Sequence, residues 1–190
     1  MRQNTRIFKM VLAALLSAIG ILIPIISPVK IIIEPASFTL ASHVAIFIAM
    51  FISPMVTLAV VIGTTLGFQL YGFPIVVVLR AASHVVFALV GAYLLKKKPQ
   101  ILQTPAQTAL YGIGMGIIHG ICEVLVVIPF YFGGAMSAAS YEKSFFVSVI
   151  LLVGIGTVIH SLVDFYIALF VYKPLSHVSQ VAQVSVAGKL

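Results

Sequence analysis

The stretch FPIVVVLRAASHVVFALVGAYLLKKK, Phe73–Lys98, indicates the class of the whole chain. Residues 75–95 form an apolar run that, at ~1.5 Å per residue, crosses a hydrocarbon core of ~30 Å. Arg80 and His84 nevertheless lie inside this run, four positions apart and therefore on one helical face. An arginine inside a membrane span costs ~2.5–3.5 kcal/mol on insertion scales, so it indicates a functional site or an internal ion pair. We therefore expect polar side chains from elsewhere in the chain to meet this face.

Composition extends this interpretation to all 190 residues, because 62% of them are hydrophobic whereas about 45–50% is usual in soluble domains. We predict one all-α domain, residues 1–190, that is a polytopic membrane protein with six transmembrane helices. The first helix follows a basic flank and continues past the length of a signal peptide, so we expect it to be retained. The expected helices cover residues 7–26, 38–52, 55–70, 73–98, 106–132 and 144–172. Residues 27–37 are expected to form a short extended cap on one side, and residues 175–190 a flexible tail, weakly amphipathic or disordered.

The net charge of +7 indicates topology rather than nucleic-acid binding, because the cations cluster at segment ends and form no basic stripe interleaved with aromatic residues. Six helices put both termini on one side of the membrane. Eight of the 11 Lys and Arg residues then fall on that side, two fall opposite, and Arg80 lies within a span. The eight are Arg2, Arg6, Lys9, Lys96, Lys97, Lys98, Lys173 and Lys189, and the two are Lys30 and Lys143. The positive-inside rule therefore predicts cytoplasmic termini and an external segment at residues 133–143.

With this orientation, the rise per residue gives an approximate depth for each polar side chain. Arg80 and His84 lie ~10 Å and ~16 Å below the outer surface. His119 and Glu123 fall in the outer half of the fifth helix, and His43 lies at the outer start of the second. These five side chains can meet in one outward-facing pocket. An alternative is an Arg80–Glu123 ion pair that joins two helices without any ligand, with His43 serving a structural role.

Two further polar residues lie deeper. His160 and Asp164 fall ~24 Å and ~30 Å below the outer surface, so we expect Asp164 to lie outside the pocket and to form an i,i+4 packing hydrogen bond with His160. No metal site is predicted, because Cys122 stands alone and His119/Glu123 lacks a second ligand at a fixed spacing. The absence of an H-E-x-x-H motif also argues against a metal-dependent enzyme. A self-sufficient secondary carrier or channel is a third class, although no inverted repeat is evident.

The segment Ala14-Leu-Leu-Ser-Ala18 in the first helix is similar to the Ala-x-x-x-Ala docking motif of energy-coupling factor (ECF) S components. Over nearly its whole length the chain resembles this family of substrate-binding subunits of bacterial vitamin importers. The resemblance implies a multi-pass protein of the bacterial cytoplasmic membrane whose partners are a transmembrane coupling protein and two ATP-binding-cassette ATPases. This chain has no G-x-x-x-x-G-K-[ST] loop, so we expect it to be no enzyme and to bind no cofactor, with ATP used by its partners.

The resemblance also implies an external ligand site between the last three helices and the first, third and fifth loops. By position this adds Glu34 and Tyr141 to the five pocket residues, and Tyr71 and Tyr131 are added because they lie near the outer ends of their helices. Arg80 beside His84 suits a carboxylate, so a small acid such as niacin or pantothenate is the predicted substrate. A large amide-rich vitamin such as cobalamin is the alternative, because glycine-rich helices leave room for it. Ala14 and Ala18 are predicted to form the partner-docking surface, unless that face packs inside the bundle.

Overall fold

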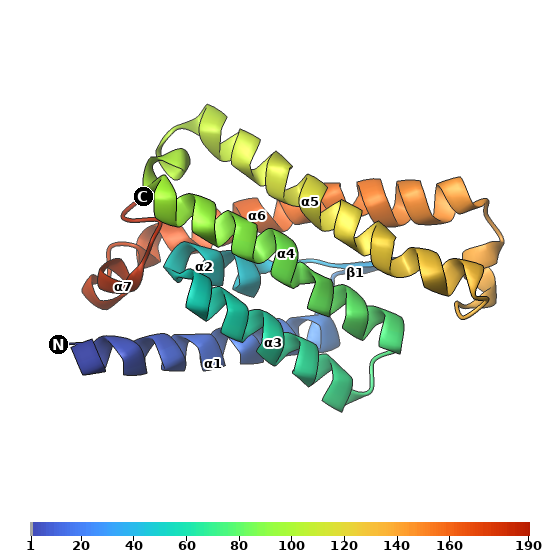
Figure 1. Cartoon of the computed structure of the whole chain (residues 1–190), viewed down its shortest axis with the longest axis horizontal. Coiled ribbons are helices and arrows are strands. Elements are labelled where there is room, and N and C mark those ends of the chain that lie inside the picture. Colours follow the sequence, from blue (N-terminus) through green and yellow to red (C-terminus); the bar gives the residue numbers. More distant parts are fainter. Residues whose placement is uncertain (1) are drawn as a thin grey trace.

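The computed structural model describes residues 2–190, with side chains described from Asn4 onward. Met1 and the side chain of Arg2, one of the predicted cytoplasmic cations, therefore lie outside the description. Long helices run back and forth along one axis, and the N and C labels lie at the same end (Figure 1). The elements are α1 (Arg2–Ile26), β1 (Lys30–Ile33), β2 (Ala36–Thr39), α2 (Val44–Ile52), α3 (Pro54–Tyr71), α4 (Ile75–Lys97), η1 (Pro99–Gln103), α5 (Pro105–Phe132), η2 (Ala138–Tyr141), η3 (Phe146–Ile155), α6 (Gly156–Leu175) and α7 (Ser179–Val184).

Five helices in the described chain are long and apolar enough to cross a membrane: α1, α3, α4, α5 and the continuous helix formed by η3 and α6. The predicted all-α membrane protein is confirmed at this level. The predicted helix at residues 38–52 needs correction, because α2 has only nine residues and Phe38 and Thr39 belong to β2. The β-branched run Ile31–Ile33 pairs antiparallel with residues 36–38. The first residues of the expected helix therefore belong to the second strand of the extended cap.

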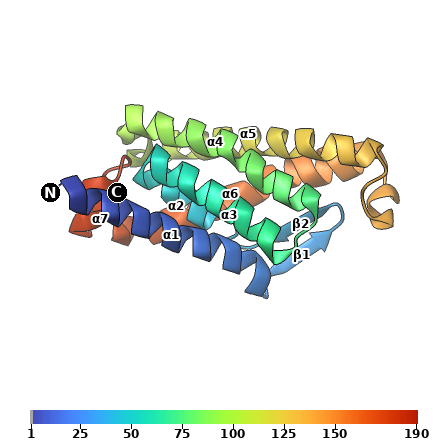
Figure 2. The same ribbon diagram turned by 60° about the horizontal axis from the view of Figure 1, so that its bottom comes forward.

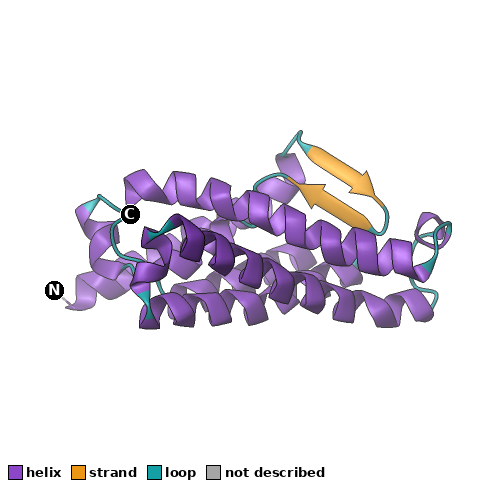
Figure 3. Cartoon of the chain, turned by 90° about the horizontal axis from the view of Figure 1, so that it is seen from above, coloured by secondary structure: helices purple, strands orange, loops and turns teal. Residues whose placement is uncertain are grey.

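The β1–β2 hairpin lies beyond the end of α1, at the part of the molecule away from the termini (Figure 2), and β2 contacts η3 and α6. In the view from above, both strands lie along the outside of the helices (Figure 3). After β2 the chain turns into the bundle, where all nine residues of α2 are buried. The half-length α2 can therefore be apolar on every side, and its first turn begins in the interior of the protein.

Glycines allow α1 and α3 to approach closely. A side-chain carbon at Gly63 would collide with Ser17 of α1, and one at Gly20 would collide with Thr64 of α3. Ser17 and Gly20 therefore face α3 and do not belong to the same surface as Ala14 and Ala18. Ala14 and Ala18 themselves are exposed on the outer face of α1.

The C-terminal segment, expected from sequence to be a flexible tail, packs against the bundle. Val181 and Val184 of α7 are buried in the core. The backbone N–H groups of Val186 and Ala187 both donate to the carbonyl of Phe51, which lies in the last turn of α2. Carbonyls in the last turn of a helix lack partners within the helix, so this contact satisfies one of them and anchors the C-terminal end of α2.

Candidate functional site

Asp164 of α6 holds the start of α2 in the middle of the protein. Its Oδ1 accepts a hydrogen bond from the N–H of Ala41 at 2.8 Å, and its Oδ2 accepts one from the N–H of His43 at 2.8 Å. The carboxylate is fully buried. Free N–H groups and a positive end of the helix dipole at the start of α2 favour an anion there. A residue 121 positions away along the sequence thus supplies the helix cap and fixes His43 in the interior.

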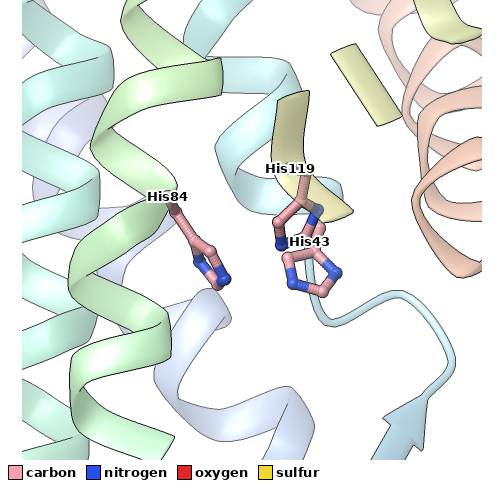
Figure 4. A group of neighbouring side chains, drawn as sticks. All are labelled: His43, His84 and His119. Atoms are coloured by element: carbon pink, nitrogen blue, oxygen red, sulfur yellow. The ribbon is translucent and has the colours of Figure 1, made fainter. Parts of the chain in front are cut away.

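Four of the five histidines of the chain gather around this point. The ring centroid of His43 lies 4.9 Å from that of His84, 4.7 Å from that of His119 and 5.1 Å from that of His160. His84 comes from α4, His119 from α5 and His160 from α6, whereas His43 directly precedes α2. Figure 4 shows the rings of His43, His84 and His119 close together. We call these four residues the histidine cluster.

Glu123 of α5 connects the cluster to Arg80. Its Oε2 accepts a hydrogen bond from Nε of Arg80, and its Oε1 accepts one from Nε2 of His84 at 3.2 Å. The ion pair considered from sequence is therefore present, with Glu123 2% exposed and the Arg80 side chain 14% exposed. The two terminal amino groups of Arg80 donate to none of the described residues. The guanidinium thus keeps its outer edge available for a ligand.

The remaining ring nitrogens have a distinct set of partners. Nδ1 of His43 lies 3.1 Å from Asp164 Oδ2, and Nδ1 of His119 lies 3.0 Å from Ser161 Oγ. Nε2 of His119 is buried and has no hydrogen-bond partner in residues 2–190, its nearest carboxylate oxygen being Glu123 Oε1 at 3.5 Å. A buried nitrogen without a partner calls for an explanation, because such atoms are uncommon in folded proteins.

A cavity of about 150 Å³ opens beside the cluster. Arg80, Glu123 and all four clustered histidines line it together with aromatic rings from the hairpin, from α3 and from the α3–α4 turn. The other lining residues are Gly20, Pro24, Lys30, Ser37, Phe38, Thr39, Ser42, Ile46, Thr64, Phe68, Phe73, Val77, Ala81 and Thr157. A charged and polar floor with aromatic walls suits a small planar ligand that carries an acidic group.

Five of the nine substrate residues expected from sequence line this cavity: Arg80, His84, His119, Glu123 and His43. The other four do not. Tyr71 is exposed at the end of α3, and Tyr131 and Tyr141 contact each other with ring centroids 5.0 Å apart. Glu34, in the hairpin turn, accepts a hydrogen bond from Ser137 near η2. Glu34, Tyr131 and Tyr141 thus gather around the η2 loop, and a role for any of the nine in binding stays a prediction.

His160 lines the cavity, although the depth estimate had placed it too deep to do so; Asp164 lies outside the lining, as predicted, but its carboxylate contacts His43. Two features explain the correction. Residues 146–155 form a π-helix, which rises less per residue than the assumed α-helix. In addition, α5 and the η3–α6 helix extend beyond α3 and α4 at the end away from the termini (Figure 1). Depths counted from the outer end of the η3–α6 helix were therefore too large. The i,i+4 spacing of His160 and Asp164 was the only feature of the sequence that indicated polar contacts here.

These features describe a helical membrane protein with an internal cavity of ligand size that opens between the hairpin and the long helices. No protein-family model and no solved structure matches the chain. The chain is 41% identical over 175 residues to the niacin transporter NiaX of Lactococcus lactis subsp. cremoris (strain MG1363). The aligned region covers 92% of this chain and 77% of the relative. This relative is an ECF S component, and the chain belongs to that family. It is therefore a multi-pass protein of the bacterial cytoplasmic membrane and a substrate-binding subunit rather than an enzyme.

Proposed function

We propose that this chain binds niacin, pyridine-3-carboxylic acid, in the cavity beside the histidine cluster and delivers it for uptake. Two observations support the proposal: the similarity to a niacin transporter, and a cavity that has the size of this ligand and places Arg80 where a carboxylate can pair with it. The cavity is the stronger of these two observations, because it is a feature of this chain itself, whereas the similarity concerns another protein.

The volume favours a single ring. A cavity of ~150 Å³ accommodates benzene, whereas pockets that hold drug-sized ligands measure roughly 300–1,000 Å³. The cavity of about 150 Å³ therefore fits a pyridine ring with one substituent. Cobalamin, the large alternative considered from sequence, greatly exceeds this volume.

The polar lining favours a carboxylate. Arg80 uses only Nε for Glu123, so its two terminal amino groups can donate to the two oxygens of a ligand carboxylate in a bidentate pair. Phe38, Phe68 and Phe73 line the same cavity and offer ring faces and edges to an aromatic ligand. In this arrangement the carboxylate recognises Arg80 and the ring lies between apolar walls.

Calorimetry on the detergent-purified protein tests this assignment with nicotinate and nicotinamide, which share the ring but differ in the charged group. We expect nicotinate to bind and nicotinamide to bind far more weakly, because an amide cannot form the charge-assisted pair. Arg80→Ala should cost ~2–5 kcal/mol in nicotinate affinity and should remove the preference between the two compounds. Lys173→Gln, an exposed change in the last turn of α6, is the matched control. Equal binding of both compounds by the unmodified protein would refute the assignment.

We further propose that transport requires a transmembrane coupling protein and two ATP-binding-cassette ATPases, which hydrolyse the ATP. Ala14 and Ala18 on the exposed face of α1 are the proposed docking strip, because small side chains let another helix approach closely. Replacing both by Trp should abolish co-purification with the coupling protein and ATP-dependent uptake, while nicotinate binding stays near wild type. Ser17→Trp, one position away but facing α3, should instead disrupt folding. Loss of ligand binding in the Ala14/Ala18 variant would show that the strip is internal.

The proposed topology has six crossing segments, with the hairpin and α2 together forming the second, and both termini in the cytoplasm. Supporting it, the N and C labels share one end of the molecule, where α4 also ends with its lysines (Figure 1). Cytoplasmic enrichment of Lys and Arg then gives the orientation.

A further inference from the structure

We propose that His43, His84 and His119 bind a divalent transition-metal ion at the floor of the cavity, and that the open coordination position of this ion receives the substrate. The second half of this statement rests on the proposed niacin function, and the first half does not. No local motif indicates such a site, because the three ligands come from three separate parts of the chain.

The geometry of three rings supports the site. One ring nitrogen from each of His43, His84 and His119 lies within 4.8 Å of the other two. A tetrahedral zinc ion with Zn–N bonds of ~2.0–2.1 Å needs its nitrogens ~3.4 Å apart. Small rotations of side chains that already face one another (Figure 4) close this difference.

Each of the three histidines also has an outer partner, as metal-ligating histidines have. His43 Nδ1 contacts Asp164, His84 Nε2 contacts Glu123, and His119 Nδ1 contacts Ser161. A histidine that donates one ring N–H to such an oxygen presents the lone pair of its other nitrogen to a metal. The partners thus leave His43 Nε2, His84 Nδ1 and His119 Nε2 as three lone-pair donors. The last of these is the buried nitrogen without a hydrogen bond.

The charges around the cluster favour a cation. With neutral imidazoles, the carboxylates of Asp164 and Glu123 outweigh the guanidinium of Arg80 by one unit of negative charge. Lys30 also lines the cavity, but it lies at the exposed hairpin, where its ammonium donates to the Pro24 carbonyl, so the negative sum remains at the floor beside the histidines. An anionic substrate needs the opposite sign there. A divalent ion changes the sum from −1 to +1 and so prepares the cavity for a carboxylate.

A second possible group, His43 with His160 and Asp164, is less suited to an ion. Its ligand atoms also lie within 4.8 Å of one another. However, both oxygens of Asp164 already accept backbone N–H groups at the start of α2. Three imidazoles leave a fourth tetrahedral position open, which is the arrangement of zinc sites that bind an exchangeable ligand. The carboxylate or the pyridine nitrogen of nicotinate has the donor chemistry to fill it.

The test uses Co²⁺ as a spectroscopic probe on full-length protein purified through a tag without histidines and then stripped with a chelator. We expect one Co²⁺ per chain, with the visible absorption of a tetrahedral ion. His84→Ala and His119→Ala should lose this absorption, whereas His177→Ala, the exposed fifth histidine, should keep it. Ser161→Ala should lower the Co²⁺ affinity about 10–100-fold, as expected for an outer partner of a ligand. The absence of stoichiometric Co²⁺ binding by the unmodified protein would overturn the metal site without any reference to the variants.

Nicotinate titrations separate the two halves of the proposal. Nicotinate should shift the Co²⁺ spectrum, and its affinity should fall at least about tenfold in the stripped protein, corresponding to ~1.4 kcal/mol. Equal affinity in stripped and loaded protein, with an unchanged spectrum, would refute substrate binding on the metal while leaving the niacin function intact. If nicotinate binds neither form, the proposed function fails, and the Co²⁺ result still decides the metal site.

Discussion

The ion pair between Arg80 and Glu123 makes a quantitative prediction about stability. Glu123→Gln keeps the size of the side chain but removes the anion that faces the guanidinium. Breaking a buried ion pair by removing one partner costs ~3–5 kcal/mol, because the other charge stays buried without compensation. The Arg80 side chain keeps 14% of its surface exposed in the cavity, which places the expected loss near ~3 kcal/mol.

A double-mutant cycle isolates the pair. Arg80→Met alone leaves Glu123 buried with only histidines as partners, and we expect a similar loss of ~3 kcal/mol. The double variant Arg80→Met/Glu123→Gln removes both desolvated charges, and replacing both members of a buried pair is often neutral. It should therefore be more stable than either single variant, with a coupling energy of at least ~2 kcal/mol.

The assay is thermal unfolding of detergent-purified protein in the presence of a chelator, followed by size-exclusion analysis of what remains monodisperse. At this chain length ~1 kcal/mol corresponds to ~2–4 °C in Tm, so each single variant should unfold roughly 6–12 °C below wild type. Glu142→Gln, which neutralises an exposed carboxylate, is the matched control and should leave Tm unchanged. Strictly additive losses in the double variant, or single variants with the Tm of wild type, would refute the reasoning.

Three further predictions concern orientation, the C-terminal segment and the cavity wall. In a Cys122→Ala background, an impermeant thiol reagent applied to intact cells should label a cysteine at Ser137 but not one at Ser179, and the reverse pattern would invert the topology. Deleting residues 179–190 should lower Tm, because it exposes core surface and frees the Phe51 carbonyl, whereas an unchanged Tm would mean that the segment contributes no stability. Gly156→Ala should weaken nicotinate binding in calorimetry while the protein stays monodisperse, because the added carbon collides with the ring of Phe38, which lines the cavity. Wild-type affinity in that variant would remove Phe38 from the binding surface.

Much of the helical framework was predictable, because membrane spans are long and uniformly apolar. The sequence located α1, α3, α4 and α5 to within a few residues at most boundaries, and Arg80 inside α4 correctly indicated polar partners. The short α2 was not predictable in the same way. Residues 38–52 read as one apolar helix, and only pairing with residues 30–33 shows where the strand ends and the helix begins.

The polar centre was predictable in part. Depth counting grouped His43, His84, His119, Glu123 and Arg80, all of which line the cavity. It missed His160, which lines the cavity as well, because a constant rise per residue does not describe a helix that begins with a π-helical stretch. The cap that Asp164 provides for α2 joins residues more than 120 positions apart, and no local sequence pattern predicts such a contact.

Asp164 also shows why folding and binding cannot be separated at this site. The same carboxylate holds the first turn of α2 in the interior and fixes Nδ1 of His43, so it determines both where the half-length helix begins and which nitrogen of His43 faces the cluster. The chain between β2 and α2 passes directly over this carboxylate, with Ala41 donating to it and Thr39 lining the cavity. One buried carboxylate thus joins His43 of the histidine cluster, the first turn of α2 and the segment that follows β2 in a single set of hydrogen bonds.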